Sequence, residues 1–172
     1  MTKTYLHRPN ITIKAKFSSE KVPLFRYRLE ATKAGASAQA KTVCAIMQNP
    51  SYAGVEVADR SAQVLERVVF EKGYKEFRGV ERLIIVNQFA FIQTNEFLGK
   101  DEQIGKENNR QLAKAIEEAD IILIAWGKDN PYHERKNEIL KIVKAMKSKL
   151  VLQTSRHPSR VIYEGFIQQY DA

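Results

Sequence analysis

The chain has 172 residues, of which 44% are hydrophobic, and its formal net charge is +8. This length fits a single domain spanning 1–172, and the hydrophobic content is enough for a core. No stretch approaches the roughly 18 apolar residues of a membrane-spanning helix, and the start, MTKTYLHRPN, lacks the apolar segment of a secretion signal. The single cysteine, Cys44, has no disulfide partner. These features favour a cytoplasmic protein without membrane contact.

The positive charge is concentrated at the two ends of the chain. Residues 1–41 hold nine Lys and Arg against two acids, and 128–160 hold nine against three, whereas 42–127 hold ten against thirteen. Two basic segments around a slightly acidic middle indicate a surface that binds a polyanion such as nucleic acid. The lysines of 136–149 could instead form the solvated face of a helix.

The N-terminal part of the chain has the pattern of strands. Segments 11–16 and 22–31 alternate apolar and polar residues, which predicts two strands that could pair as a hairpin. A small, polar segment at 32–40 predicts a loop. Thr42–Met47 is apolar without alternation, which is typical of a strand buried on both faces.

From residue 59 onward, helical and strand patterns alternate. In chain order they predict a helix at 59–73 capped by Asp59 or Ser61, a strand at 82–86, a helix at 106–119, a strand at 121–125, a helix at 133–147, a strand at 150–153 and a last helix from Pro158 to about Gln168. Such alternation favours a parallel sheet covered on both faces. We therefore expect an α/β protein: a three-layer α/β/α sandwich with a central, mostly parallel four-stranded sheet over 41–169, plus an N-terminal strand or hairpin within 1–31.

Polar residues follow all four strands of this predicted sheet. They are Gln48-Asn49-Pro50-Ser51, Asn87-Gln88-Phe89, Trp126-Gly127-Lys128 and the segment 154–160. Ligand sites of open α/β sheets form at the carboxyl ends of the strands, so we expect these clusters to share one site. Each cluster alone could be only a turn, a cap or a core side chain.

Common catalytic motifs are absent from the sequence. There is no HExxH or paired CxxC, no Walker loop, no GxGxxG and no GxSxG, so no metal and no cofactor are expected. Asn49 is not a strong base, but its amide can hold and orient a water. That is sufficient for a substrate whose bond breaks largely by itself while the site stabilises the developing charge.

These motifs resemble two families. The runs IMQNPSYAG, VNQFAF, IGKENN and AWG, together with Asp59 and Thr94, resemble a prokaryotic and phage family known as domain of unknown function 1643, over roughly 25–160. More distantly, the four strand ends resemble the motifs of the uracil-DNA glycosylase superfamily in the right order: Gln48-Asn49-Pro50-Ser51-Tyr52, Ile84-Ile85-Val86-Asn87, Leu123-Ile124-Ala125-Trp126-Gly127 and His157-Pro158-Ser159-Arg160.

The second resemblance implies a role for each matching residue. Asn49 would orient the attacking water, and His157 would donate a hydrogen bond to the base oxygen. Contact with the flipped base is implied for Gln48 and Asn87, with Tyr52, Phe89 and Phe91 competing to stack on it. Contact with DNA is expected from six further residues: Ser51, Lys128, Ser155, Arg156, Ser159 and Arg160. A helix N-terminus at Pro158 would favour a phosphate, and Val161 or Ile162 could act as an apolar wedge.

The first hypothesis is a monomeric DNA glycosylase that hydrolyses the N-glycosidic bond of a flipped-out base in double- or single-stranded DNA. Because Arg160 replaces the usual proline and Ser51 displaces Tyr52 by one position, the expected base is a modified or mismatched pyrimidine. DNA repair is the general role expected of such an enzyme, and hypermodified cytosine in phage DNA, with a role in antiviral defence, is the specific case. The alternatives are a non-catalytic nucleic-acid-binding module of the same fold and an enzyme acting on free nucleotides or nucleosides.

Overall fold

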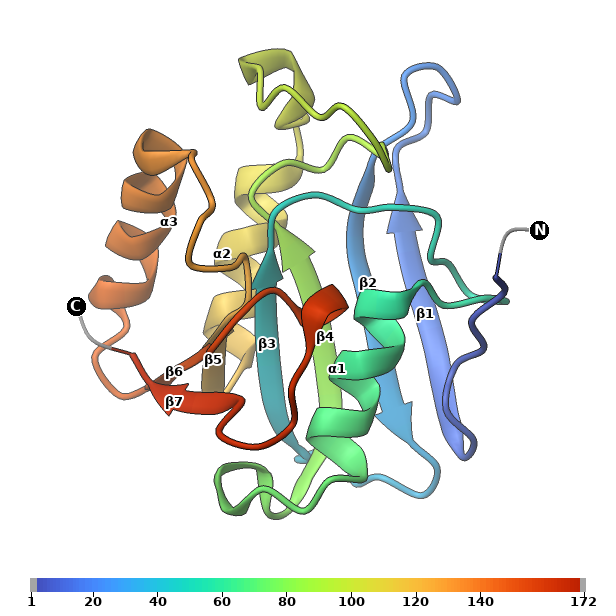
Figure 1. Cartoon of the computed structure of the whole chain (residues 1–172), viewed down its shortest axis with the longest axis vertical. Coiled ribbons are helices and arrows are strands. Elements are labelled where there is room, and N and C mark those ends of the chain that lie inside the picture. Colours follow the sequence, from blue (N-terminus) through green and yellow to red (C-terminus); the bar gives the residue numbers. More distant parts are fainter. Residues whose placement is uncertain (1–2, 171–172) are drawn as a thin grey trace.

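The computed structural model describes residues 3–170, and its seven strands form one mixed sheet (Figure 1). The order across the sheet is β1-β2-β4-β3-β5-β6-β7. The strands are β1 (Ile11–Phe17), β2 (Arg26–Lys33), β3 (Lys41–Met47), β4 (Val80–Asn87), β5 (Ile121–Ile124), β6 (Leu150–Thr154) and β7 (Ile167–Gln169). The four central strands, β4, β3, β5 and β6, pair in parallel, whereas β1, β2 and β7 join antiparallel at the two sides.

Helices cover both faces of the sheet. The first helix, α1 (Arg60–Phe70), packs on one face, while α2 (Asn108–Glu118) and α3 (His133–Ala145) pack on the other (Figure 1). Asp59 caps α1 as predicted, because its side chain accepts a hydrogen bond from the main-chain N–H of Ala62. A cap of this kind stabilises a helix by about 1 kcal/mol.

The middle strand, β3, explains why both faces need helices. Val43, Ala45 and Met47 contribute to the core under α1, whereas Cys44 and Ile46 contribute to the core under α2 and α3. A strand covered on both sides has no polar face, which is why its sequence does not alternate. Burial raises the pKa of the Cys44 thiol to about 12, so this cysteine is an inert core residue.

The mixed α/β class is confirmed, but the sheet has seven strands rather than four. The N-terminal strands extend it because β2 pairs with β4, and the C-terminal segment adds β7 beside β6. The helix predicted from Pro158 to Gln168 is wrong: only the short 3-10 turn η3 (Pro158–Arg160) forms there. Val161 and Ile162 are β-branched and Gly165 has a φ of +65°, so a continuous helix is disfavoured.

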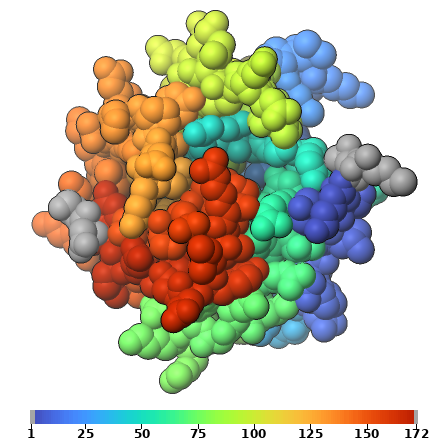
Figure 2. All heavy atoms as spheres, in the orientation of Figure 1, coloured from blue at the N-terminus to red at the C-terminus, as the bar shows by residue number. Residues whose placement is uncertain are grey.

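The carboxyl ends of the four parallel strands lie at the same end of the sheet, which is called its carboxyl edge below. The loops that follow them, 48–59, 88–107, 125–132 and 155–166, therefore lie at the same end of the molecule. Figure 2 shows the C-terminal part of the chain (red) across the centre of the face that carries α1, beside the orange loop that precedes α3. This edge is where the sequence predicts a site.

Candidate functional site

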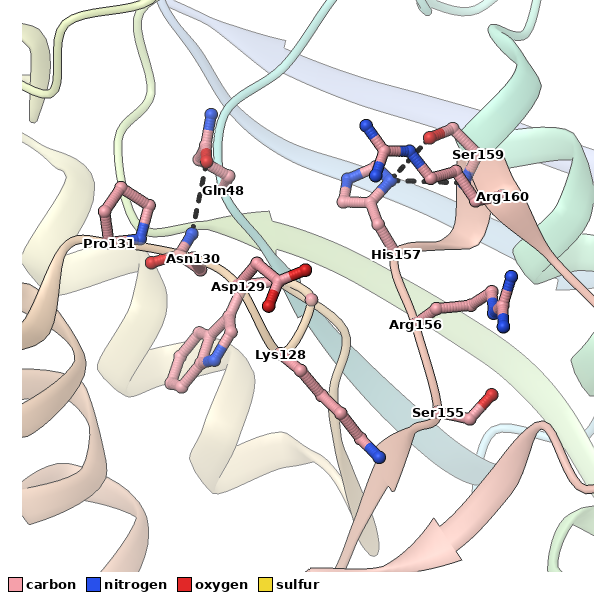
Figure 3. A pocket seen from close by; sticks show the side chains of 12 residues that line it. Gln48, Lys128, Asp129, Asn130, Pro131, Ser155, Arg156, His157, Ser159 and Arg160 are labelled. Carbon is pink, nitrogen blue, oxygen red and sulfur yellow. Dashed lines mark hydrogen bonds between the residues drawn. The ribbon is translucent and has the colours of Figure 1, made fainter.

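Two neighbouring cavities lie at the carboxyl edge of the sheet. The Asn49 cavity has a volume of about 350 Å³ and is lined by Tyr5, Met47, Gln48, Asn49, Ser51, Tyr52, Asp59, Arg60, Ser61, Gln93, Thr94, His157 and Ser159. The Lys128 cavity (Figure 3) has a volume of about 510 Å³ and is lined by Gln48, Trp126, Gly127, Lys128, Asp129, Asn130, Pro131, Ser155, Arg156, His157, Ser159 and Arg160. Both volumes are typical of small-molecule pockets. Gln48, His157 and Ser159 belong to both cavities and form the wall between them.

Hydrogen bonds fix the side chain of Asn49 at both ends. Nδ2 donates to the main-chain oxygens of Gln93 (2.7 Å) and Pro50 (3.2 Å), and Oδ1 accepts from Gln48 Nε2 (2.9 Å). Because two carbonyl groups need a donor, the amide cannot be reversed, and Oδ1 must face Gln48. An amide oxygen accepts two hydrogen bonds, so one lone pair of Oδ1 is left for a water.

His157 is arranged as a neutral hydrogen-bond donor. Its Nδ1 accepts from the main-chain N–H of Ser159 (3.1 Å) and lies 2.8 Å from Ser159 Oγ (Figure 3). Acceptance at Nδ1 puts the one proton of the neutral ring on Nε2. Burial, followed by the charge of Arg160, lowers the pKa of His157, while Asp59 acts in the opposite direction. The ring is therefore neutral at pH 7, and its Nε2–H has no partner within residues 3–170.

Gly127 allows the loop after β5 to approach this histidine. Its φ is +90°, a conformation that other residues rarely adopt, and a side chain there would place its Cβ 3.4 Å from the Cβ of His157. The Trp-Gly pair at this strand end thus has a structural role. Trp126 packs in the core under α2 and α3 while its edge reaches the Lys128 cavity.

A chain of amides connects Asn49 to the helix α3. Asn130 Nδ2 donates to Gln48 Oε1 (3.2 Å; Figure 3) and to Gln88 Oε1 (2.7 Å). Arg135, on α3, donates from Nε to the main-chain oxygen of Gln88 (2.7 Å). The side chain of Gln48 is thus fixed by hydrogen bonds to Asn130 and to Asn49, and this in turn restricts the position of Asn49. No sequence pattern indicated Asn130, because its partners are distant in the chain.

The cations at the site come from the C-terminal basic segment. Lys128, Arg156 and Arg160 line the Lys128 cavity together with Ser155, and none of the three forms an ion pair with any described residue. Arg60, which the sequence analysis missed, lines the Asn49 cavity and donates from Nε to the main-chain oxygen of Ser159 (2.7 Å).

Three arginines of the N-terminal basic segment have partners away from the two cavities. Arg8 pairs with Glu71, and Arg28 pairs with Glu30 and Glu118. Arg26 is buried, and its Nη1 supports the main-chain oxygen of Ala53 in the loop after β3. The expectation that both basic ends supply one polyanion surface is therefore not supported for these three arginines.

Of the aromatic candidates, only Tyr52 lines a cavity. Its side chain is 44% exposed, at the wall of the Asn49 cavity. Phe89 is buried in an aromatic cluster and packs edge-to-face against Phe97 and Tyr132, with ring centroids 5.2 and 5.0 Å apart. Phe91 packs against Phe25 in the same manner. Of the three competing aromatics, Tyr52 is thus the one at the Asn49 cavity, whereas the prediction that Phe89 contacts the base is wrong for this structure because Phe89 is buried in the interior.

Asn87 does not reach either cavity. It is 0% exposed, and neither its Nδ2 nor its Oδ1 has a hydrogen-bond partner. Its neighbour across the parallel ladder, Met47, has its side chain on the same face and lines the Asn49 cavity. The expectation that Asn49, Asn87 and His157 share one cavity thus holds for Asn49 and His157 only. Asn87 lies behind the wall, beside Met47, with an unsatisfied amide.

The N-terminal segment contributes a further wall that no sequence pattern indicated. Tyr5 forms an isolated β-bridge with Ala58 and lines the Asn49 cavity. His7 anchors this segment, with Nδ1 2.7 Å from Glu66 Oε2 and Nε2 2.6 Å from the main-chain oxygen of Gly54. Both partners are acceptors, so both ring nitrogens carry protons. Burial alone would lower the pKa of His7, but Glu66 and the carbonyl groups outweigh burial and raise it.

The hydroxyl groups expected at phosphates differ in their availability. Ser51 Oγ is 2.8 Å from Thr94 Oγ1, and Ser159 Oγ is bound to His157, so both are already used. Within the described range of residues 3–170, no three His, Cys, Asp or Glu side chains gather as metal ligands. In the same range no helix has the length and apolar character needed to cross a bilayer.

The fold and the site together define a mixed α/β protein with paired cavities at the carboxyl edge of its sheet, one of them rimmed by cations. The chain belongs to the family described as "Protein of unknown function (DUF1643)", whose family model matches residues 26–159. This match confirms the first resemblance, and it includes every predicted site residue except Arg160. No curated protein and no solved structure matches the chain.

Proposed function

We propose that the protein is a DNA glycosylase that removes a flipped-out pyrimidine. The observation that carries this proposal is the shared cavity of Asn49, which can hold a water, and His157, a neutral donor with a free Nε2–H. A base inside a duplex cannot be reached, so the nucleotide must be extruded into a pocket at a cost of a few kcal/mol. The likeness of the four strand ends to the uracil-DNA glycosylase superfamily supports the same conclusion.

In this mechanism the glycosidic bond breaks as negative charge moves onto the base. His157 Nε2–H donates to the base oxygen where that charge develops, and a donor so placed contributes about 10²–10³ in rate. A neutral imidazole suits this role because it strengthens its hydrogen bond as the base becomes anionic. Asn49 Oδ1 holds the water on the side of the sugar.

The Lys128 cavity would receive the DNA backbone. Lys128, Arg156 and Arg160 are the unpaired cations there, and Arg60 adds a fourth beside the Asn49 cavity. Each phosphate neutralised on a duplex contributes about −0.9 to the slope of log affinity against log salt concentration. We expect Lys128→Gln or Arg156→Gln to weaken binding to all sequences alike and to reduce that slope by about 1.

The base is expected to be a modified or mismatched pyrimidine. Tyr52 offers an aromatic face, and the unsatisfied amide of Asn87 could read a base edge if the side chain of Met47 turned aside. Buried amide groups without partners cost about 1–3 kcal/mol, so a ligand that pairs with Asn87 would relieve a real penalty. Hypermodified cytosine in phage DNA, and a role in antiviral defence, is the case that we favour.

The test is a panel of labelled DNA strands and modified phage genomes, treated with the protein and then with alkali to break abasic sites. Alkali should break the strand at the target base after treatment with wild type, and His157→Ala should be slower by about 10²–10³ because it loses the donor to the base oxygen. His133→Ala is the matched control, since His133 is exposed at the start of α3 and lines neither cavity. Equal rates for the two variants would contradict the role of His157.

A non-catalytic nucleic-acid-binding module is the second candidate. One observation favours this candidate. The amide of Asn49 connects the loops after β3 and β4 by its hydrogen bond to Gln93, and this structural role explains an asparagine at position 49 without catalysis. Such a module would bind DNA with the same salt dependence and leave every strand of the panel intact. An enzyme on free nucleosides would show no dependence on strand length or on salt.

A further inference from the structure

The wall of the Asn49 cavity contains a fixed carboxylate. Asp59 is the only Asp or Glu among the residues lining this cavity within 3–170, and its side chain is largely buried, at 8% exposure. Its Oδ1 accepts from the N–H of Ala62 at 2.8 Å, which holds it at the start of α1. Its Oδ2 has no hydrogen-bond partner among the described residues and is free to accept a proton.

Charged and titratable groups on both sides of the cavity interact with Asp59. Burial lowers the pKa of Arg26 to about 10, with Asp59 acting in the opposite direction, so this buried guanidinium stays charged at pH 7. Burial, and then Asp59, raises the pKa of Tyr52 on the same cavity wall, and Asp59 also opposes the lowering at His157. Arg60, the next residue, adds a positive charge at the cavity. Asp59 therefore acts electrostatically on both sides of the pocket.

Asn49 can orient the attacking water but provides no group that accepts its proton. An attacking water must lose a proton, and a carboxamide cannot take it. Both hydrogens of Asn49 Nδ2 are committed to the carbonyl groups of Gln93 and Pro50, so Asn49 can orient the water only through Oδ1. A base in the same cavity would accelerate this proton transfer, and neutral His157 is already assigned to the leaving base.

We propose that Asp59 is the general base of this site, an inference that rests on the glycosylase function proposed above. The water oxygen bonds to C1′ of the sugar as the bond from C1′ to the base nitrogen breaks, and the electron pair leaves with the base. The water proton passes to Asp59 Oδ2, and the departing base accepts a hydrogen bond from His157 until solvent protonates it. The charge of Asp59 also stabilises the positive charge that develops at C1′.

The test is Asp59→Asn, which removes the base and keeps the helix cap, because Asn caps helices as well as Asp does. The single-turnover rate of abasic-site formation should fall by about 10²–10⁴, while DNA affinity stays within a few-fold and the melting temperature is nearly unchanged. The pH profile of the rate should also differ between wild type and the variant. Asp59→Ser, a second capping residue, should behave in the same way if the Asn variant folds poorly.

Asp120→Asn is the matched control. Asp120 also accepts a main-chain hydrogen bond, from Thr42. It directly precedes β5 and therefore lies at the opposite ends of the parallel strands from the cavity. Its variant should keep the wild-type rate. If Asp59→Asn or Asp59→Ser keeps the wild-type rate and pH profile while wild type forms abasic sites, Asp59 is not the base and the glycosylase function stands. If wild type forms none, the function and the inference fail together.

Discussion

Replacing Asn49 with Asp tests how the central side chain of the site is held. The change keeps the acceptor that faces Gln48 but removes both donors to the carbonyl oxygens of Gln93 and Pro50. A hydrogen bond of this kind contributes about 0.5–1.5 kcal/mol, so Asn49→Asp should lower the free energy of unfolding by about 1–3 kcal/mol at pH 7. For a chain of this length, about 2 kcal/mol corresponds to a loss of roughly 4–8 °C in melting temperature.

The pH dependence separates this explanation from a general loss of packing. The two carbonyl oxygens would raise the pKa of the new carboxyl group above its value in the unfolded chain. The folded variant then binds the proton more tightly, and its stability relative to Asn49→Ala should increase as the pH falls through the raised pKa. The protonated carboxyl can donate to Gln93 again. Urea unfolding of wild type and both variants at pH 7 and pH 5 measures the difference. An Asp variant as stable as wild type at pH 7 would refute the assigned hydrogen bonds.

Three further predictions follow from the neighbouring contacts. Folding raises the pKa of His7. The stabilising effect of protonated His7 is therefore fully present below about pH 6.5, the pKa in the unfolded chain, and it is lost as the pH rises through the pKa in the folded state. The stability gap between wild type and His7→Gln, measured by urea unfolding, should therefore be larger at pH 5.5 than at pH 8.5. Gly127→Ala should lose about 1–3 kcal/mol from its left-handed conformation and also lower the glycosylase rate by displacing His157. Gly73 has a φ of +72° and open space around it, so Gly73→Ala should lose stability but keep the glycosylase rate. An equal loss of activity in both variants would contradict the proposed contact between position 127 and His157. Ile162, 54% exposed beyond η3, should be needed for base extrusion, so Ile162→Ala should slow reaction on duplex DNA more than on single strands; equal slowing on both would rule out a wedge.

The central part of the fold could be predicted from the sequence because its signals are local. Buried strands without alternation, such as Thr42–Met47, and amphipathic helices with a cap, such as the one begun by Asp59, are visible in a short window of sequence. The C-terminal segment could not be predicted in this way. Pro158 is a good start for a helix, but the packing of Val161 and Phe166 against the core under α1 outweighs the helical pattern.

The site was predictable at the level of strand ends and not at the level of side chains. The rule that parallel strands end at one edge brings Asn49 and His157 together from far apart in the chain. The direction of each side chain depends on partners that no local pattern indicates. Asn87 is fully buried beside Met47, Phe89 packs in an aromatic cluster, and Tyr5 reaches the cavity from the N-terminal segment through a single β-bridge.

The sequence indicates where Asp59 lies but not what its second carboxylate oxygen does. The residue is recognisable as a helix cap, and a cap that follows a strand-end loop in an α/β protein lies at the ligand edge of the sheet. Its role depends on a cavity that loops 48–59 and 155–166 form together, and no short window of sequence shows that these two loops meet.

The most direct measurement is mass spectrometry of the small molecules released when the protein is incubated with modified phage DNA. A glycosylase releases one free base for every abasic site that it leaves in the polymer, and the identity of that base names the target. Equimolar free pyrimidine and abasic sites, both strongly reduced in His157→Ala, are the predicted result. A protein that binds the same DNA with the expected salt dependence but releases no base would contradict the proposed function.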